Sequence, residues 1–398
     1  MDRTIYREIK ATQSVWTLAV ILAGLIAVAG WSVLYVEHNG HAVTGMNNQI
    51  VWGLPHVFAI ILIVAASGAL NVASMASVFD KKAYKPLSRL SGILAIALLV
   101  GGLGVLVLDL GRPDRLLIAM TVFNFTSIFT WNVLLYTGFI GVVAVYLWVQ
   151  MDRTVHPKFT KPMGIIAFVW RLVLTTGTGS IFGWLVARPG YDAAIMAPLF
   201  ISLSFALGLA AFLLVLLLLY RLDDRKIGTA LISRMTNLLG VFIAAALYFT
   251  IIQHVTNIYV AEHSGFERFI LSDGGIYTTL FWWVQIAIGG LLPMALAFGK
   301  RPIDATARAV VVSVLVIIGG FAQLYVIIIG GQAYPLDMFP GFEVTSSFYD
   351  GEVAGYSPSF FELALGVGGV AVAIFATGVA AKILRILPTN LADKNLSD

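Results

Sequence analysis

The sequence contains no cysteine among its 398 residues and few charges, with Asp, Glu, Lys and Arg making up 12%. Without cysteine the protein can form no disulfide and cannot supply thiolates for an iron–sulfur cluster, so any such cluster must belong to a partner. Soluble globular domains carry about 25% charged residues, so the charge content excludes a soluble enzyme. Walker motifs, zinc-ligand spacings and nucleophile elbows are also missing, which excludes nucleotide-binding and hydrolytic chemistry.

The sequence is instead rich in long apolar runs, because 59% of its residues are hydrophobic. A hydrocarbon core about 30 Å thick requires about 20 apolar residues per helix. We therefore predict an all-α polytopic membrane protein, a single membrane domain over residues 1–398 with about ten transmembrane helices. The expected spans are 15–36, 50–79, 91–109, 127–150, 164–187, 194–220, 237–260, 276–299, 309–330 and 359–383.

The positive charges indicate how these spans are oriented. An even number of spans places both termini on one side, here called face A, and the other side is called face B. Face A carries 20 of the 25 Lys and Arg residues. Cytoplasmic loops carry an excess of Lys and Arg, so we expect face A to be cytoplasmic in the inner membrane. The net charge of +4 reflects this distribution and does not indicate nucleic-acid binding. Face B carries only Arg112, Arg115, Arg188 and Arg268.

The longest loop, 331–358, is on face B and combines acidic with aromatic residues. Aromatic side chains outside the membrane suggest a partner interface or a flap over an opening. An aromatic belt at the membrane interface explains them equally well. The loop contains Asp337, Glu343, Asp350 and Glu352 together with Tyr334, Phe339, Phe342, Phe348, Tyr349 and Tyr356.

Polar side chains within the spans cluster near face B and predict a quinone site. A quinone head requires hydrogen-bond partners at its carbonyls, a proton-passing group such as histidine, and apolar walls. His56 follows Pro55 about one and a half turns into the second span, and Asn132 and Tyr136 enter the fourth span from the same face. We expect His56 with Asn132 or Tyr136 to contact the quinone, although the tyrosine could also be a belt residue.

His56 has two other interpretations. A histidine beside a proline kink can simply bond to a neighbouring backbone carbonyl. His56 and His254 lie at matched depth, so they could also ligate a b-type haem between two helices. A transmembrane electron path usually requires a second haem, and no histidine lies within a span near face A.

Three further ionisable residues within spans are candidates for proton transfer, because charges inside a membrane are costly and usually functional. Arg171 lies deep in the fifth span, and His254 lies near the face-B end of the seventh. Glu362 lies one turn into the tenth span, where its carboxylate could instead reach the interface. Arg171 also has a structural interpretation, in which it joins helices through backbone carbonyls or extends to the surface. The hydroxyls and amides near it are Thr175, Thr176, Thr178, Ser180, Asn71, Ser74 and Ser77.

Glycine is abundant at 38 residues and occurs in pairs within the spans. Small residues let membrane helices approach closely, so these pairs predict tight helix packing and not a phosphate loop. The pairs are Gly101-Gly102, Gly289-Gly290, Gly319-Gly320 and Gly368-Gly369.

Four further segments form a recognisable set. They are Leu54-Pro55-His56, the small-residue run 65–69, the basic loop 81–85 and Leu108-Asp109-Leu110-Gly111-Arg112-Pro113. Together they resemble the NrfD/PsrC family, the membrane subunits of polysulfide reductase type. The late segments 329–335 and 343–347 look most like the DsrP branch of that family, from complexes associated with sulfite reduction. The resemblance covers nearly the whole sequence.

The resemblance implies a fold and a role. The fold has two four-helix bundles, at about 50–187 and 194–330, with flanking helices at 15–36 and 359–383. The role is that of a respiratory electron-transfer subunit that binds menaquinone near face B, without haem or iron–sulfur clusters of its own. It exchanges electrons with a periplasmic, ferredoxin-like iron–sulfur subunit, alongside cytochromes, a cytoplasmic iron–sulfur protein and the membrane lipid.

By position in the motif, His56 and a polar group of the fourth span resemble the quinone ligands, and Asp109 with Arg112 resembles the wall beside them. The alternatives are the haem-bearing cytochrome and a secondary transporter, which would show inverted repeats. Pro55 and Pro198 begin spans of the same direction and suggest a parallel repeat, which suits the electron-transfer subunit better. Proton translocation and the direction of electron flow do not follow from these motifs.

Overall fold

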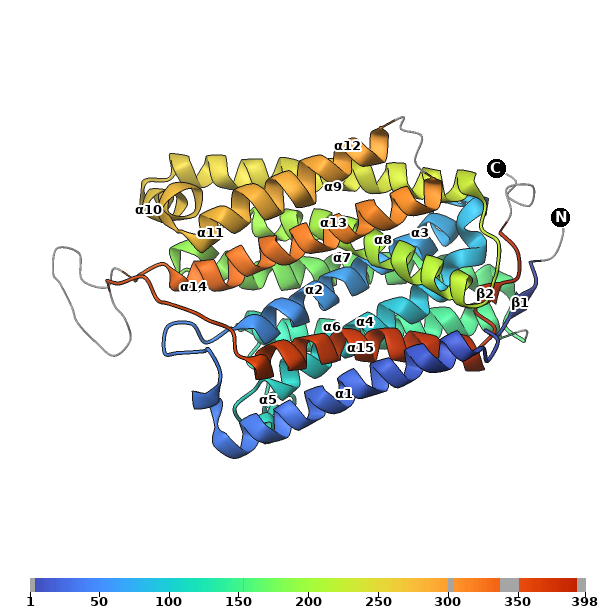
Figure 1. The fold of residues 1–398 in the computed structure, drawn as a ribbon, viewed down its shortest axis with the longest axis horizontal. Helices are drawn as coiled ribbons and strands as arrows, with labels where there is room; N and C mark the ends of the chain where they lie inside the picture. Colours follow the sequence, from blue (N-terminus) through green and yellow to red (C-terminus); the bar gives the residue numbers. More distant parts are fainter. Residues whose placement is uncertain (1–3, 153, 300–303, 337–350, 392–398) are drawn as a thin grey trace.

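The structure is a computed structural model that describes residues 4–152, 154–299, 304–336 and 351–391. Ten helices in these ranges are long and apolar enough to cross a membrane, which confirms the all-α polytopic prediction (Figure 1). The spanning segments are α1 (Gln13–Asn39), α2 with α3 (Leu54–Ala69, Asn71–Ser77), α4 (Ser88–Leu108), α6 (Ile128–Met151), α7 (Thr160–Trp184), α8 (Met196–Leu222), α9 (Thr229–Tyr259), α11 to α12 (Ile276–Phe298), α13 to α14 (Ala305–Ala333) and α15 (Phe360–Ile383). The short elements include α5 (Leu116–Ala119), α10 (Ser264–Arg268) and the strands β1 (Tyr6–Arg7) and β2 (Leu387–Pro388).

The second span begins later than the sequence predicts, at Leu54 instead of residue 50. The backbone N–H groups of Val51 and Trp52 donate to the side-chain oxygen of Gln332, both at 3.0 Å, and not to a helix. His56 therefore lies in the first turn of α2 and not one and a half turns inside it, which corrects the predicted depth.

The same span is interrupted at Leu70, between α2 and α3. A helix break leaves backbone groups without helical partners, which is costly inside a membrane. The Ser91 hydroxyl of α4 closes this break, because it donates to Ala69 O at 2.7 Å and accepts from Ala73 N at 3.1 Å.

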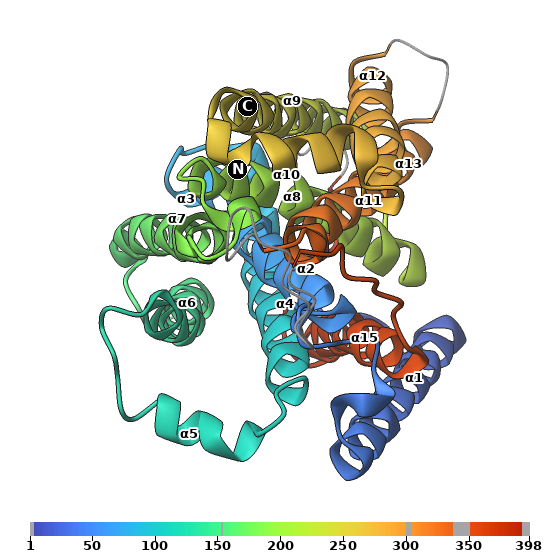
Figure 2. The ribbon, with the colours of Figure 1, turned by 90° about the vertical axis from the view of Figure 1, so that its left-hand side faces the viewer.

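α2 packs most extensively on α4 and α8. For reference, we call α2, α3, α4, α6 and α7 the first helix group, and α8, α9, the span Ile276–Phe298 and α13 the second. α15 packs on α2 and α4, and α1 packs on α15 at the periphery (Figure 2). α2 also packs closely against α8, so the boundary between the two groups is itself a helix contact.

The glycine pairs lie at such contacts. A Cβ on Gly289 would lie 2.1 Å from Gly319 Cα, and a Cβ on Gly101 would lie 2.5 Å from Gly369 O. Both distances are far below van der Waals contact, so larger residues would force the helices apart. Two pairs therefore meet in the second group and two join α4 to α15, as expected for close packing.

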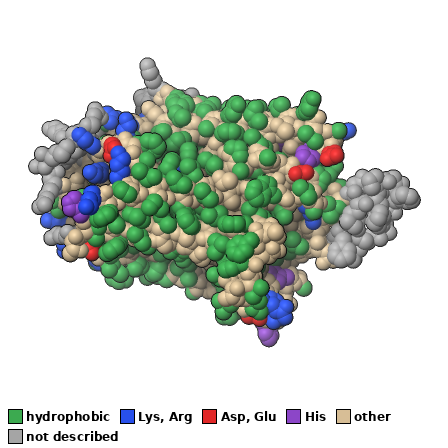
Figure 3. Space-filling view, turned by 180° about the vertical axis from the view of Figure 1, so that it is seen from behind, with side chains coloured by type: hydrophobic (Ala, Val, Ile, Leu, Met, Phe, Trp, Pro, Cys, Tyr) green, Lys and Arg blue, Asp and Glu red, His purple; other side chains and the backbone are tan. Residues whose placement is uncertain are grey.

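The surface follows the predicted charge pattern. Hydrophobic side chains cover the middle of the molecule, and Lys and Arg concentrate at the end that carries the termini (Figure 3). This end is face A.

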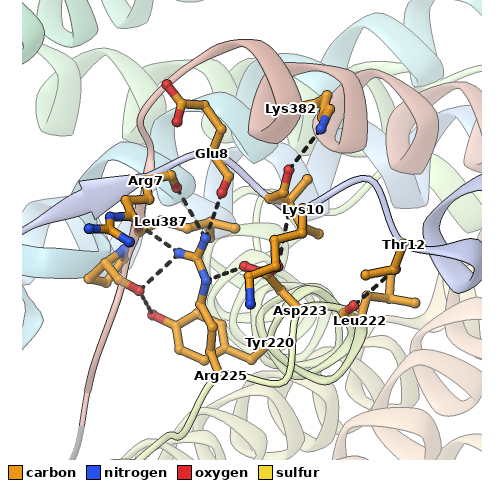
Figure 4. Close-up of polar contacts among 12 residues, drawn as sticks. Arg7, Glu8, Lys10, Thr12, Tyr220, Leu222, Asp223, Arg225, Lys382 and Leu387 are labelled. Carbon is orange, nitrogen blue, oxygen red and sulfur yellow. Dashed lines mark hydrogen bonds and ion pairs between the residues drawn. The ribbon is translucent and has the colours of Figure 1, made fainter.

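A polar cluster on face A holds the segment before α1 and the segment after α15 against the end of α8 (Figure 4). The Arg225 guanidinium pairs with Asp223 at 2.5 Å and donates to four backbone carbonyls. These carbonyls belong to Arg7, Glu8, Leu387 and Pro388. Because β1 pairs with β2 beside this cluster, the two ends of the protein form one unit. We refer to it as the Arg225 clamp.

Candidate functional site

The structure brings together two residues that the sequence analysis named separately. His56 Nδ1 of α2 lies 2.8 Å from Asp109 Oδ2, at the C-terminal end of α4. Both side chains are largely buried, at 14% and 4% exposure. The approach is close but too oblique for a linear hydrogen bond. A carboxylate at Nδ1 orients the imidazole and leaves Nε2 for a further partner.

An aromatic cluster covers one side of this pair. Trp52 stacks on the His56 ring with centroids 5.9 Å apart, and it also contacts Phe129, Phe182 and Tyr191. The cluster therefore joins the start of α2 to α6, α7 and the segment before α8. It supplies apolar walls beside a buried imidazole, which is the environment that planar ligands require.

Asn132 and Tyr136 of α6 face α7. The Asn132 amide donates to Ile128 O at 2.9 Å and to Gly177 O at 3.0 Å. Its Oδ1 atom is buried and has no hydrogen-bond partner among the described residues. Tyr136 instead shares a hydrogen bond of 3.0 Å with the Thr178 hydroxyl. Asn132 is therefore the better candidate of the two for a ligand, because it has an unused acceptor one turn from Phe129.

Hydrogen bonds from Gln332 and Arg188, which we call the Gln332 brace, hold the segment that precedes α2. The Gln332 side chain accepts from the backbone at Val51 and Trp52 and donates to Trp52 O at 2.9 Å. Arg188 donates to the carbonyls of Gln332 and Gln49, at 2.8 and 3.0 Å. This brace positions the Trp52 ring relative to His56.

Tyr191 completes the brace. Its hydroxyl donates to Ile328 O, and burial raises the pKa of this hydroxyl above its usual value. The group therefore remains a hydrogen-bond donor at neutral pH.

Glu362 has a firmly bound carboxylate at the start of α15. It accepts from Gly45 N at 2.8 Å, Ser359 N at 2.7 Å and the Tyr356 hydroxyl at 2.6 Å. Burial and the contact with Glu362 raise the pKa of Tyr356, so this hydroxyl remains protonated. Tyr356 also accepts from Leu54 N at 2.6 Å, so Glu362 supports the beginning of α2.

A narrow cavity lies between α1, α4 and α15. Asp109 and Glu362 both line it, with Ser32 and Thr44. Asp109 thus contacts His56 and also borders this cavity.

The structure does not bring the two named arginines to the pair. Arg112 is 64% exposed and forms an ion pair with Asp114, with Nε and Oδ1 3.1 Å apart. Arg171 is buried in α7 between the rings of Phe168 and Phe205, and its Nη1 donates to Ser67 O at 3.3 Å. Arg171 thus contacts the interior of α2, well along the helix from His56.

His254 forms a second imidazole–carboxylate pair. Its Nδ1 lies 2.5 Å from Glu267 Oε1, and its ring lies against Phe281. The two histidines contact different aromatic residues, His56 the ring of Trp52 and His254 the ring of Phe281.

The predicted face-B loop lies partly outside the described residues. Residues 337–350, and with them Asp337, Glu343, Asp350 and the aromatics from Phe339 to Tyr349, are in that part. Of the described residues, Glu352 is exposed, and Tyr356 supports α2 through the contact given above.

Three residues of these sites do not stand out in the sequence, namely Trp52, Gln332 and Glu267. The apolar pattern places Trp52 inside a continuous helix and Gln332 in a loop. Glu267 follows the seventh span and resembles an ordinary loop charge. Glu267 follows His254 by only 13 residues. A short turn after the seventh span can bring such a side chain back against that span, and this spacing is what could have indicated the contact.

Comparison with known proteins identifies the family. The family model described as polysulphide reductase, NrfD, matches residues 42–335. The chain belongs to the NrfD family. The matched range runs from the loop before α2 to the end of α14, and it contains both imidazole–carboxylate pairs.

Three relatives illustrate the range of the NrfD family. The Hdr-like menaquinol oxidoreductase integral membrane subunit of Archaeoglobus fulgidus is 26% identical over 95% of both proteins. A putative dimethyl sulfoxide reductase membrane subunit of Halobacterium salinarum is also 26% identical, over 95% of this protein and 92% of the relative. A polysulfide reductase component of Wolinella succinogenes is 23% identical over 72% of this protein and 96% of the relative.

Proposed function

We propose that this protein is the quinone-interacting membrane subunit of a respiratory oxidoreductase complex, and that menaquinone binds at His56 near face B. The observation that carries the proposal is the His56–Asp109 pair beside Trp52. The Archaeoglobus relative, similar along its whole length, is named as a menaquinol oxidoreductase subunit and supports the proposal.

The residues present fit a naphthoquinone head. His56 Nε2 is placed to bond one ring oxygen, because Nδ1 already faces Asp109. The buried and unpartnered Asn132 Oδ1 can accept from a quinol hydroxyl. Trp52 and Phe129 would provide the flat apolar walls.

Bound menaquinol would supply electrons and protons. In this site His56 accepts a proton at Nε2, and the Asp109 carboxylate stabilises the resulting imidazolium at Nδ1. Asp109 also borders the narrow cavity towards Glu362, which gives that proton a route to water at face B. The Glu362 carboxylate accepts three hydrogen bonds, so we assign it to positioning α2 and keeping this route polar.

The electrons must leave through another subunit, because the sequence has no cysteine for a cluster. We propose a periplasmic, ferredoxin-like iron–sulfur subunit docked on face B, with face A in the cytoplasm. Cytochromes and a cytoplasmic iron–sulfur protein complete the complex proposed for the DsrP branch. We further propose that Arg171, held by Ser67 O and two aromatic rings, serves proton movement between face A and this site.

The break at Leu70 is the observation that favours the alternative of a secondary transporter, since broken helices bind ions in such proteins. Here Ser91 already bonds the freed groups of Ala69 and Ala73. These groups are therefore not free to bind a transported ion.

The proposal is tested by quenching of a fluorescent menaquinol analogue with the purified protein in nanodiscs. We expect saturable quenching that weakens at least about tenfold in His56→Ala, which corresponds to the loss of a strong hydrogen bond. His254→Ala is the matched control, and it should retain the affinity of the wild type.

Saturable binding that is equal in the wild type and both variants would place the quinone elsewhere. Absence of saturable binding to a folded wild-type protein would contradict a quinone site formed by this subunit alone. Arg171→Ala is then informative, because the proposal requires it to bind the analogue normally.

A further inference from the structure

The second helix group contains a buried pair that the proposed quinone site does not use. His254 Nδ1 of α9 lies 2.5 Å from Glu267 Oε1 of α10, and the Asn257 amide donates to Glu267 Oε2 at 3.2 Å. The Glu267 side chain is 1% exposed. Both carboxylate oxygens thus have partners, and the imidazole retains Nε2 for a further bond.

A narrow cavity adjoins this pair and leaves room for about one water molecule. Its lining is mostly apolar and includes four polar side chains, those of Gln253, His254, Gln285 and Gln323. Amide side chains both donate and accept, so such a water would find the two to four partners that buried water requires. The cavity is too small for a quinone ring.

The helices around this cavity are locally unwound. Gln285 belongs to a π-helix at Leu280–Leu291, and Val326 and Ile327 belong to another at Val326–Gly330. π-Helical turns are rare and occur frequently at functional sites. Two of them border the same cavity, which is a second, independent indication that it has a role.

The charged groups nearby have other partners. Arg268 pairs with Asp273 at 2.8 Å, and His263 lies 3.8 Å from Asp192. No Lys or Arg among the described residues forms an ion pair with Glu267. One shared proton makes the His254–Glu267 pair neutral overall, and buried sites favour neutrality.

We propose that His254 and Glu267 form a proton-binding site, with a water in the adjoining cavity, that exchanges protons with face B. On uptake, protonated water transfers its proton to His254 Nε2 and becomes neutral water, while the proton at Nδ1 moves towards Glu267. Release reverses these transfers, and no electron moves. The site is separate from the quinone and does not depend on the function proposed for His56.

The test is infrared difference spectroscopy of the purified full-length protein in nanodiscs, between acidic and alkaline buffer. We expect a protonated-carboxyl band that Glu267→Gln removes and that Asp109→Asn retains. His254→Gln removes the imidazole that shares the proton, so the Glu267 carboxyl should hold it and show the band in neutral buffer. In deuterated buffer the wild-type band should shift, because the proton exchanges through the cavity water.

Two results would overturn the proposal. The first is a Glu267→Gln spectrum identical to that of the wild type in a protein that elutes and unfolds normally, since the pair would then exchange no proton. The second is a loss of menaquinol-analogue affinity of more than about tenfold in Glu267→Gln, since the pair would then belong to a quinone site. If His56→Ala binds the analogue normally while Glu267→Gln loses the band, the quinone proposal fails and this one stands.

Discussion

The two imidazole–carboxylate pairs are alike in chemistry and differ in their surroundings. The His56–Asp109 pair lies under Trp52, near an amide with an unused acceptor. The His254–Glu267 pair also has one aromatic neighbour, Phe281, but three glutamine amides line its cavity and an asparagine already donates to the carboxylate. Flat aromatic walls favour binding of a ring-shaped ligand. Amides around a water-sized space favour a bound water that can pass a proton to the pair. The same pair of side chains therefore supports different functions according to what surrounds it.

The largest difference should appear in stability. His254→Leu leaves Glu267 buried with only Asn257 as its partner, and loss of one member of a buried pair costs about 3–5 kcal/mol of unfolding free energy. His56→Leu should cost less, because Asp109 borders a cavity that water can enter. Chemical denaturation in detergent measures both. The double variant His254→Leu with Glu267→Leu should recover most of the loss, and equal losses for the two single variants would contradict the comparison.

The next effect concerns quinone affinity. Asp109→Asn removes the negative charge that lies 2.8 Å from His56 Nδ1, so we expect quinone affinity to fall roughly 10- to 100-fold through the loss of this charge interaction. Glu267→Gln is the matched change in the other pair and should leave affinity within about twofold. The fluorescence-quenching titration described above compares them directly. An equal loss in both variants would mean that the two pairs act as one site.

A smaller effect is expected for the aromatic residues. Trp52→Leu removes the ring that stacks on His56, and aromatic contacts contribute about 0.5–1.5 kcal/mol beyond the area they bury, so we expect roughly tenfold weaker binding. Phe281→Leu makes the corresponding change beside His254 and should not alter binding. Unchanged affinity in Trp52→Leu would remove the aromatic wall from the proposed site.

The smallest effect is expected for Arg112. Exposed ion pairs contribute about 0–1 kcal/mol, so Arg112→Ala should change quinone affinity by about twofold or less in the same titration. Arg188→Ala is the contrasting variant, because its guanidinium supports the Trp52 segment through Gln49 and Gln332. A large loss in Arg112→Ala would support the sequence-based placement of this residue beside the quinone.

The sequence is sufficient to predict the spans because their length is set by the thickness of the bilayer. It also names His56 as a candidate, since polar groups inside spans are few, and the family resemblance names Asp109. Their contact does not follow from the sequence, because it depends on how α2 packs against the end of α4. The sequence also predicts the start of α2 too early, for a related reason. The backbone just before this helix is bonded by the side chain of Gln332, which is 280 residues away from Trp52.

The second pair shows a different limit. Glu267 lies in a loop by sequence, and only the turn of α10 places it under α9. The π-helices do not follow from the sequence, because their residues have the same apolar pattern as an α-helix. The sequence places Arg171 within a span and offers backbone carbonyls as its partners, in agreement with the bond to Ser67 O. The two aromatic rings beside it do not follow from the sequence.

The Arg225 clamp has a consequence for how the protein is made. Its guanidinium binds carbonyls of Arg7 and Glu8, which precede α1, and of Leu387 and Pro388, which follow α15. The clamp can therefore close only after the tenth span has been made. Until then the segment before α1 lacks these partners on face A, so clamp closure follows the synthesis of all ten spans.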